Sequence, residues 1–426
     1  MKIAYVVSGM KMTFVVNEMS AHQQAGWEVL PLASCRTERF ENWSEAMIKW
    51  CKRAVYQPNA FVQIRTTLRE MVTHPLRFWR VCFWVVTLFF HSPVEFAKAV
   101  YELMSACHFA RHCRQFGVEH IHVHFASRSL SLGLMIGMLT DLPVSCTVHA
   151  FDIFTRSAGS LRPRLAKCKF IAAISRFNIE YLRTVCGESV ADLCHVVHCG
   201  IDMEKFKPTG LQTQPSRMAC VARLERKKGL VVAIAACAKL RESNVEFLFQ
   251  IIGDGPERER LEEQIHQLGL EDCVVLLGPK ANDQLVQFYS KASVFFMPCV
   301  KTQNGDMDGI PVAMMEAMAC EVPVVSTRLS GIGELVRHNV NGLLVDTRHE
   351  GRETIDDGRP SSLVPHPSFV EALAEAVGSL LSNPDRIRRF GRAARQQVEQ
   401  NFNVTKTAAQ LRQLIQEKNH QKHEIT

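Results

Sequence analysis

Two basic side chains in the second half of the chain lie where a strand pattern changes into a helix pattern. Arg223 and Lys228 belong to the stretch Arg223-Leu-Glu-Arg-Lys-Lys228-Gly229, which follows the apolar run at 218–222. At this edge of a parallel sheet, helix-terminal N–H groups and fixed cations bind phosphate groups. A basic helix start is also common on a solvated surface, so these two cations alone leave both interpretations open.

A glycine pair ends the next strand pattern, in Ile252-Gly253-Asp254-Gly255-Pro256. Gly253 and Gly255 permit a close backbone approach or a left-handed turn, and Pro256 suits a first helical turn. The stretch lacks the G-x-G-x-x-G fingerprint of dinucleotide-binding proteins. A Rossmann dehydrogenase is therefore disfavoured.

The most informative segment runs from Asp306 to Ala319. Pro311 is placed to start a helix, so the backbone N–H groups of Gly309 and Ile310 should lie at its positive end. Glu316 lies on that helix among apolar and small residues, where a carboxylate can accept two hydroxyls, as a ribose diol offers them. A glutamate paired with a core cation is the alternative.

Histidines mark the corresponding edge of the first half. His149 ends a strand pattern on the side where open α/β sheets bind ligands, although a satisfied core histidine is the alternative. His120, His122 and His124 alternate along one strand and so share a face. Their steps of about 6.5 Å cannot by themselves close a tetrahedral metal site. We therefore expect no metal.

The elements that must position these residues follow a regular order of short apolar runs and amphipathic stretches. This pattern is typical of βαβ units and predicts two doubly wound parallel sheets, an α/β fold. The expected strands are 3–7, 28–32, 120–124, 144–149, 170–174 and 195–197 in the first half, and 218–222, 247–252, 274–277, 294–297, 322–326 and 342–345 in the second.

Composition shifts predict the boundaries of the domains. We expect an N-terminal domain over 1–207, a second domain over 208–385 and C-terminal helices over 386–426 that pack back across the boundary. The Pro, Gly, Thr, Gln and Ser residues of 207–216 indicate a linker. The polar stretch 349–367 indicates an inserted loop.

A helical insertion at about 47–115 interrupts the first domain. Within it, the run Val81–Phe90 is apolar and follows Arg77-Phe-Trp-Arg80. Ten residues are too few to span a bilayer, but Trp, Phe and Arg together suit a helix at a membrane interface. A buried core helix is the equal alternative.

Motifs in both halves of the chain occur in a fixed order. They are His122-Val-His124, Thr147-Val-His149, Ile174-Ser175, Cys199-Gly-Ile-Asp202, Val221-Ala-Arg223-Leu with Lys228-Gly229, Ile252-Gly-Asp-Gly255-Pro, Asp308-Gly-Ile-Pro311 with Glu316-Ala-Met-Ala, Pro323-Val-Val-Ser326, Gly331-Ile-Gly-Glu334 and Asn341-Gly342. This ordered set resembles glycosyltransferase family 4, whose fold is GT-B, two Rossmann-like domains facing across a cleft. Members acting in exopolysaccharide and colanic acid synthesis are similar in the N-terminal stretch Met12-Thr-Phe-Val-Val-Asn-Glu18.

This resemblance implies a retaining transfer of a hexose from a UDP-sugar or GDP-sugar to a lipid-linked or saccharide acceptor, without an obligate metal or other cofactor. Arg223 and Lys228 would neutralise the departing diphosphate. Asp308 would face the sugar hydroxyls, and Glu316 would hold the ribose.

The remaining donor-binding positions implied by the resemblance are Gly253, Gly255, Gly309, Ile310 and Pro311. On the acceptor or sugar side it implies His149, with His124 and Ser175. One position departs from the family pattern, which has Glu where this chain has Asp308. The shorter side chain moves the carboxylate by about 1.5 Å.

Length and composition set the outer limits. The 426 residues suggest two or three domains, and 47% hydrophobic with 22% charged residues is typical of globular proteins. The formal net charge of +7 lies wholly in 1–205, with 23 basic against 16 acidic residues. This favours an anionic partner such as a membrane or a phosphorylated substrate over nucleic acid, with a solvated surface as the alternative.

The absence of a secretory h-region and the fifteen scattered cysteines without a C-x-x-C pair predict a cytoplasmic chain with reduced thiols, peripheral to the inner face of the membrane if the 77–90 helix binds it. Two alternatives to transfer stay open. One is a sugar-nucleotide epimerase of the same architecture. The other is an inactive member that only binds nucleotide sugar, with Asp308 as the sign of lost activity.

Overall fold

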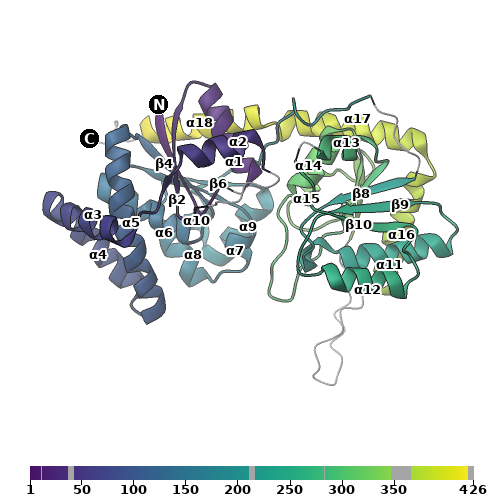
Figure 1. Ribbon diagram of the computed structural model, residues 1–426, viewed down its shortest axis with the longest axis horizontal. Coiled ribbons are helices and arrows are strands. Elements are labelled where there is room, and N and C mark those ends of the chain that lie inside the picture. The colour runs from purple at the N-terminus through teal and green to yellow at the C-terminus, as the bar shows by residue number, and fades with distance from the viewer. Residues whose placement is uncertain (11, 37–42, 211–215, 283, 347–365, 421–426) are drawn as a thin grey trace, which may run out of the picture. The chain divides into compact units, whose positions relative to one another are not determined.

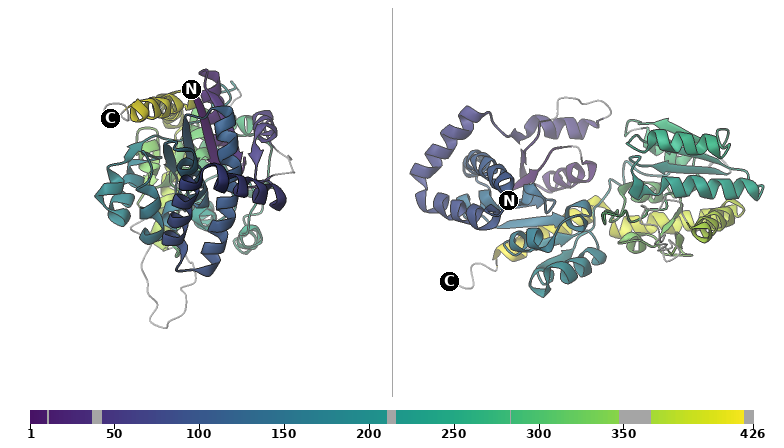
Figure 2. Two further views of the ribbon diagram at one scale, coloured as in Figure 1. Left: turned by 90° about the vertical axis from the view of Figure 1, so that its left-hand side faces the viewer. Right: turned by 90° about the horizontal axis from the view of Figure 1, so that it is seen from below.

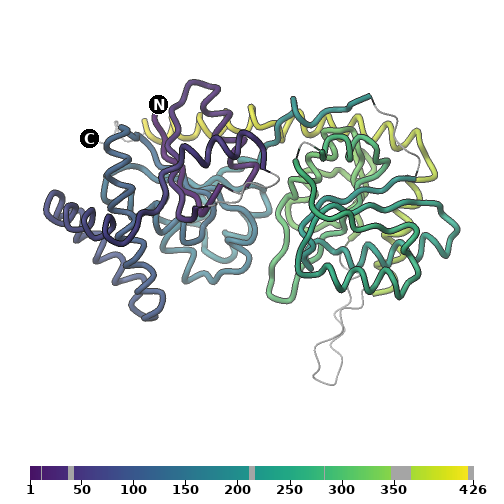
Figure 3. The backbone as a smooth tube through the Cα atoms, viewed as in Figure 1, coloured from purple at the N-terminus to yellow at the C-terminus, as the bar shows by residue number. Residues whose placement is uncertain are grey.

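The computed structural model describes residues 1–10, 12–36, 43–210, 216–282, 284–346 and 366–420 (Figures 1 and 3). It divides into two compact units. Unit 1 comprises Met1–Gly200 and Val404–Thr426, and unit 2 comprises Ile201–Asn403. Each unit is an α/β layer structure built around one parallel sheet.

Unit 1 holds a seven-stranded parallel sheet in the order β3-β2-β1-β4-β5-β6-β7. The central strands are buried along their whole length because helices cover both faces, which explains their nearly continuous apolar runs. The strands are β1 (Lys2–Val7), β2 (Glu28–Ala33), β3 (Val55–Tyr56), β4 (His120–His124), β5 (Val144–Val148), β6 (Ile171–Ala173) and β7 (Cys194–Val196).

Most helices of unit 1 connect successive strands. They are α1 (Thr13–Gln24), α6 (Arg128–Thr140), α7 (Phe151–Phe154), α8 (Ala158–Leu165), α9 (Arg176–Cys186) and α10 (Glu188–Ala191). Ser175 caps α9 through its side chain, which accepts from the N–H of Asn178. The sheet order reverses between β1 and β4, and this switch point is where open α/β sheets place ligands.

The helical insertion is present, with bounds close to those predicted. It consists of α2 (Glu45–Arg53), α3 (Ala60–Thr73), α4 (Pro75–Phe89) and α5 (Pro93–Phe116). Its first loop contains the short edge strand β3, which the sequence did not reveal because two residues carry no period. Figure 2 shows α3 and α4 away from the sheet of unit 1.

Unit 2 holds a six-stranded parallel sheet in the order β10-β9-β8-β11-β12-β13. Its strands are β8 (Arg217–Val221), β9 (Leu248–Ile252), β10 (Val274–Gly278), β11 (Val294–Phe296), β12 (Val324–Thr327) and β13 (Gly342–Val345). Its helical elements are the 3-10 turn η1 (Arg226–Lys228) and the helices α11 (Leu230–Glu242), α12 (Arg258–Gln267), α13 (Leu285–Ser290), α14 (Val312–Ala319), α15 (Ile332–Leu335), α16 (Pro367–Leu381) and α17 (Pro384–Asn401).

The two C-terminal helices belong to different units. In α17, Arg395 donates to the carbonyl of Ala319, and Gly391 packs against the backbone of Glu321, both within unit 2. The following α18 (Val404–His420) lies in unit 1, where Leu411 and Ile415 join the core that contains Tyr5 and Phe170. The chain therefore crosses between the units twice.

The observed division differs from the expected boundary at 207/208 by a few residues. Ile201–Phe206 belongs to unit 2, where the ring of Phe206 lies 6.2 Å from that of Tyr289. The expected third segment, 386–426, is divided between the two units, because α17 lies in unit 2 and α18 in unit 1. Most of the expected linker (residues 211–215 of 207–216) and most of the expected loop at 349–367 lie outside the described residues.

All twelve segments predicted as strands contain a strand within about two residues of the expected bounds. The fifteen cysteines are free thiols, and eleven of them are buried, as predicted from their apolar surroundings. In the part of the chain that the structure describes, no helix is long and apolar enough to cross a bilayer.

Candidate active site

In unit 2, Lys228 and Asp308 form an ion pair at the carboxyl edge of the sheet. Lys228 Nζ lies 2.8 Å from Asp308 Oδ2, and both side chains are about one-seventh exposed. Burial alone would lower the pKa of Lys228, but the adjacent Asp308 raises it above its ordinary value. Lys228 is thus a fixed ammonium, held by a partner that an incoming anion could replace.

A close backbone contact sets the position of Lys228. The next residue, Gly229, has a φ of +67°, and a Cβ there would lie 1.8 Å from the carbonyl oxygen of Pro298. The neighbouring loop is tied down further by Val300, whose N–H donates to the carbonyl of Lys227 at 3.0 Å. Only glycine permits this approach, so the turn after β8 is pressed against the end of β11.

Arg223, the other predicted cation, does not join this pair. Its side chain is 74% exposed, and Nη1 lies 3.1 Å from Glu225 Oε1. A second ion pair, Lys227 with Asp306 at 3.1 Å, lies beside Lys228 with nearly the same burial. The structure therefore joins two of the predicted catalytic residues, Lys228 and Asp308, and leaves Arg223 on a solvent-exposed turn.

The segment from Asp308 to Pro311 leads into α14. Ser330 Oγ donates to the carbonyl of Gly309 at 2.8 Å and also contacts that of Asp308. Among the described residues, the N–H groups of Gly309 and Ile310 have no acceptor. Pro311 is the N-cap, with the helix starting at Val312. This start offers unpaired donors and the positive end of a helix.

Glu316 lies on α14 with its carboxylate buried. Its Oε2 accepts a hydrogen bond of 2.9 Å from the hydroxyl of Tyr289, which lies on α13. Burial raises the pKa of Glu316 to about 7, with the Tyr289 hydrogen bond and the charge of Lys205 opposing this effect. Among the described residues, the hydrogen bond to this carboxylate comes from a phenol and not from the core cation of the alternative.

The predicted glycines serve close contacts between strand ends. A Cβ at Gly253, where φ is +145°, would lie 1.8 Å from the carbonyl of Ala222, and one at Gly255 would lie 2.6 Å from that of Leu224. The loops after β8 and β9 therefore touch through their backbones. This contact explains both glycines without a ligand, so their role toward a donor stays a prediction.

In unit 1, His149 belongs to a buried hydrogen-bonded chain. Its Nε2 lies 3.1 Å from His124 Nδ1, and His124 Nε2 lies 3.1 Å from Glu18 Oε1, which also accepts from Tyr5 at 2.6 Å. Burial and then the neighbouring His124 lower the pKa of His149 well below its ordinary value. His149 is therefore a neutral imidazole, able to donate or accept a hydrogen bond but not to supply charge.

The backbone around His149 is equally fixed. Its N–H donates to Asp152 Oδ1 at 3.0 Å, and its carbonyl accepts from the side chain of Asn178. Ser175 Oγ in turn donates to Asn178 Oδ1 at 2.9 Å. The predicted residue Ser175 thus acts in the structure as a helix cap that orients Asn178, one contact removed from His149.

The histidines of β4 approach a third polar group, Glu18 of α1. One ligand atom from each of Glu18, His122 and His124 lies within 4.8 Å of the other two. His122 Nε2 also lies 2.9 Å from Thr147 Oγ1, so these polar atoms have hydrogen-bond partners without an ion. The expectation that the protein uses no metal stays a prediction.

Sequence reasoning did not identify three partners in these contacts: Glu18, Asn178 and Tyr289. Glu18 is the last residue of the N-terminal stretch that resembles exopolysaccharide glycosyltransferases. It lies on α1, the helix after β1, and this position was the one indication that it could belong to the site. Tyr289 and Asn178 carried no signal, because Tyr289 meets Glu316, and Asn178 meets His149, only through the fold.

Each half of the chain matches the model of a known protein family. The model of Glycosyltransferase Family 4 matches residues 73–205, and that of Glycosyl transferases group 1 matches residues 202–351. The putative colanic acid biosynthesis glycosyltransferase WcaL of Escherichia coli is 38% identical over 224 residues, 52% of this chain and 50% of that protein. The amylovoran biosynthesis glycosyltransferase AmsK of Erwinia amylovora is 45% identical over 156 residues, 36% of this chain and 38% of its own length. The chain thus matches half or less of the length of these relatives.

A solved structure, Anabaena HepE in complex with UDP-glucose, superposes with a TM-score of 0.69 at 16% identity, covering 98% of this chain and 100% of that one. At this identity the match shows the fold, and it confirms the predicted GT-B architecture. The chain therefore belongs, through two adjoining domains over residues 73–351, to the glycosyltransferases of family 4 and group 1.

Proposed function

We propose that the chain is a retaining glycosyltransferase that moves a hexose from a UDP-sugar or GDP-sugar to a lipid-linked or saccharide acceptor in polysaccharide biosynthesis. The names of the two relatives support the biosynthetic setting, because both concern exopolysaccharides. The UDP-glucose in the HepE structure supports a nucleotide sugar as the donor.

The observation that carries this proposal is the Lys228–Asp308 pair beside the unpaired N–H groups that precede α14. Cleavage of the donor leaves a nucleoside diphosphate whose negative charge must be stabilised as it develops. A buried ammonium and a helix start are suited to this task because both present positive charge at the site before the diphosphate leaves. Arg223, exposed on the same turn, can swing toward the phosphates from its contact with Glu225.

The remaining assignments in unit 2 follow from chemistry. Glu316 offers a carboxylate whose one oxygen is oriented by Tyr289, which leaves the other to accept hydroxyls of the ribose. Asp308, once Lys228 turns to the diphosphate, becomes an acceptor for a sugar hydroxyl. These groups supply the needed charge within the chain, so the proposed reaction requires no resident metal.

In unit 1, we assign His149 to hold the transferred sugar and His124 to orient it. The neutral ring of His149 lies 4.9 Å from the ring of Phe14 and 4.4 Å from that of Phe125, measured between centroids. Its Nε2 is engaged with His124, and its Nδ1 lies 3.8 Å from Cys199 Sγ, a weak partner that a sugar hydroxyl can replace. Ser175 acts behind His149 by orienting Asn178.

The first test is a thermal-shift screen of UDP-, GDP- and ADP-sugars, since a ligand at 100 times its Kd stabilises by about 2.7 kcal/mol. The second compares Lys228→Met with Lys227→Met, whose parent lysines form neighbouring ion pairs of nearly equal burial. We expect Lys228→Met to lower kcat by roughly 10²-fold or more, with Lys227→Met within a few-fold of the parent.

Equal activity of the two lysine variants would contradict a role of Lys228 in the reaction. A donor that binds and is epimerised without any acceptor would instead assign the fold to an epimerase. Tight donor binding without transfer to any lipid-linked or saccharide acceptor would identify a binding protein.

A further inference from the structure

One face of the helical insertion gathers exposed apolar side chains. Among the described residues, seventeen large hydrophobic side chains are exposed, and twelve of these lie between residues 61 and 101. Single exposed hydrophobic residues are normal, but a contiguous cluster marks a binding surface. The twelve are Phe61, Ile64, Leu68, Val72, Leu76, Trp79, Phe83, Val86, Phe90, Val94, Val100 and Tyr101.

Helix α3 has polar residues on its buried face and apolar residues on its exposed face, the reverse of an ordinary surface helix. Its fully buried residues are polar, namely Gln63, Thr66 and Glu70, and they face α5, where Gln63 Nε2 lies 3.4 Å from Ser105 Oγ. Its outward stripe is apolar, with Phe61, Ile64, Leu68 and Val72 at helical spacing and 74%, 51%, 54% and 75% exposed. The hydrophobic effect within this unit does not explain that stripe.

Helix α4 carries a second outward stripe. Its inner face buries Phe78, Val81, Trp84 and Val85, which satisfies the core-helix interpretation of this segment. Its outer face continues the pattern with residues 3 or 4 apart: Leu76, Trp79, Phe83, Val86 and Phe90, of which Leu76 is 88% and Phe83 73% exposed. One helix thus buries one apolar face and presents another to solvent.

A groove opens among α3, α4 and α5, with a volume of about 390 Å³. Its lining is apolar and includes residues of both stripes, among them Ile64, Leu68, Trp79 and Val86, with Val100 from α5. The lining also contains Thr67, whose hydroxyl donates to the carbonyl of Gln63 at 2.8 Å, so the groove offers little hydrogen bonding to a peptide backbone or a sugar. It is suited to a hydrocarbon chain.

The charges of this region are of one sign wherever they are unpaired. Residues 60–116 contain seven Lys and Arg against three Glu. Each of the three carboxylates is in an ion pair: Glu70 with Arg114 at 2.6 Å, Glu95 with Lys98 at 2.7 Å and Glu102 with Arg128 at 2.5 Å. Arg65 and Arg69, both exposed on α3, form no ion pair among the described residues.

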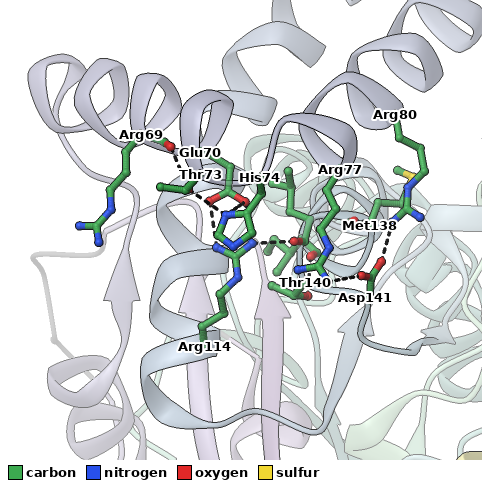
Figure 4. Close-up of polar contacts among 12 residues, drawn as sticks. Arg69, Glu70, Thr73, His74, Arg77, Arg80, Arg114, Met138, Thr140 and Asp141 are labelled. Atoms are coloured by element: carbon green, nitrogen blue, oxygen red, sulfur yellow. Dashed lines mark hydrogen bonds and ion pairs between the residues drawn. The ribbon is translucent and has the colours of Figure 1, made fainter.

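Polar contacts fasten α4 to the rest of unit 1 (Figure 4). Arg77 Nη2 lies 2.5 Å from Asp141 Oδ2, and Arg80 Nη2 lies 2.8 Å from Asp141 Oδ1, at the C-cap of α6. The same figure shows the guanidinium of Arg69 pointing away from this cluster. The outward stripe of α4 therefore lies on a helix that two ion pairs join to the end of α6.

We propose that the outer face of α3 and α4 inserts into the interface of an anionic phospholipid bilayer, with one lipid hydrocarbon chain in the groove. A protein interface carries a polar rim of both signs and about ten hydrogen bonds, which this face does not offer. An apolar stripe flanked by arginines matches a lipid interface with anionic headgroups. The 15 residues of α4 span about 22 Å, so the helix lies along the membrane and does not cross it.

This inference goes beyond the transfer reaction, and its test needs neither donor nor acceptor. The purified full-length chain is floated with phosphatidylcholine vesicles, with and without phosphatidylglycerol. Trp79→Ser with Phe83→Ser is compared with Leu268→Ser and Val340→Ser, two exposed apolar positions of unit 2. Because all four side chains are exposed, the variants should keep the parent circular dichroism and Tm.

We expect the parent to float with phosphatidylglycerol vesicles and the Trp79/Phe83 variant to lose at least tenfold in partitioning, with the unit 2 variant unchanged. Arg65→Ser with Arg69→Ser should remove the preference for anionic vesicles. Brominated lipid should quench tryptophan fluorescence in the parent and much less in Trp79→Phe, because Trp27, Trp50 and Trp84 are buried and Trp43 is half-buried.

Failure of the parent to float would overturn the proposal, as would equal flotation of the Trp79/Phe83 variant. A dimer in light scattering that this variant converts to monomer, without any vesicle binding by the parent, would assign the face to a second copy of the chain and also overturn it.

Discussion

At the scale of single residues, Glu316 is both a candidate ligand of the ribose and a buried acid, and the sequence did not indicate its burial. The sequence indicated a carboxylate on a helix, and the structure buries it beside the hydroxyl of Tyr289. Burial raises the pKa of Glu316 to about 7, although the Tyr289 hydrogen bond lowers it. In an unfolded chain the same group titrates near 4.5. The folded chain thus binds the proton more tightly, and this group lowers the stability of the ligand-free protein as the pH rises from about 4.5 to 7.

Glu316→Gln should therefore change the pH dependence of stability. Glutamine can still accept the hydrogen bond from Tyr289 but never ionises. Relative to the parent, the free energy of unfolding of the variant should rise with pH, by about 3 kcal/mol between pH 4 and pH 8, because each unit of pKa difference corresponds to about 1.4 kcal/mol. Urea unfolding at several pH values measures this. A stability difference that is the same at pH 4 and pH 8 would refute the buried-proton account.

At the scale of elements, the turn between β8 and α11 shows why residue types alone do not position a site. The motif Lys228-Gly229 predicted a cation at a helix start, but its place depends on the fit of Gly229 against Pro298 from another loop. Gly269, at the end of α12, has a similar φ of +62° with nothing near its missing Cβ. Comparing alanine substitutions at Gly229 and Gly269 therefore distinguishes the cost of backbone strain from the cost of a steric clash.

Gly229→Ala should destabilise unit 2 more than Gly269→Ala does. Both variants pay the left-handed strain of about 1–2 kcal/mol, and only the first also forces a Cβ against a carbonyl oxygen, for a total of roughly 3 kcal/mol or more. It should also weaken donor binding by displacing Lys228. Chemical denaturation of both variants gives the comparison, and equal losses would mean that the turn is free to move away from Pro298.

At the scale of the whole molecule, the chain returns to unit 1 through α18. Leu411 and Ile415 lie in the core of that unit, and His120 Nδ1 lies 3.0 Å from Asn419 Oδ1. The five tryptophans, Trp27, Trp43, Trp50, Trp79 and Trp84, all belong to unit 1. Their fluorescence therefore reports on that unit separately.

A chain ending at Asn403 should lose the fold of unit 1 and keep that of unit 2. Removing α18 exposes core side chains worth about 1.5–3 kcal/mol each, which together exceed about 5 kcal/mol. We expect tryptophan fluorescence to show early unfolding while much of the far-ultraviolet circular dichroism persists. A chain ending at His420 is the control. Unchanged fluorescence unfolding in the shorter chain would show that α18 is dispensable.

The sequence by itself determined the fold class and proposed the residues of the candidate site. Periodicity located twelve strands, because parallel strands covered on both faces must be apolar throughout. The sequence also indicated Arg223, Lys228 and Asp308 before helix starts and Glu316 on a helix. Tertiary structure alone decided which of these residues meet. It paired Lys228 with Asp308, left Arg223 with Glu225, and brought Glu18 and Tyr289 to their partners. It also decided which face of α4 is buried and which is exposed, because a segment that is apolar on every side does not indicate which of its faces other helices will cover.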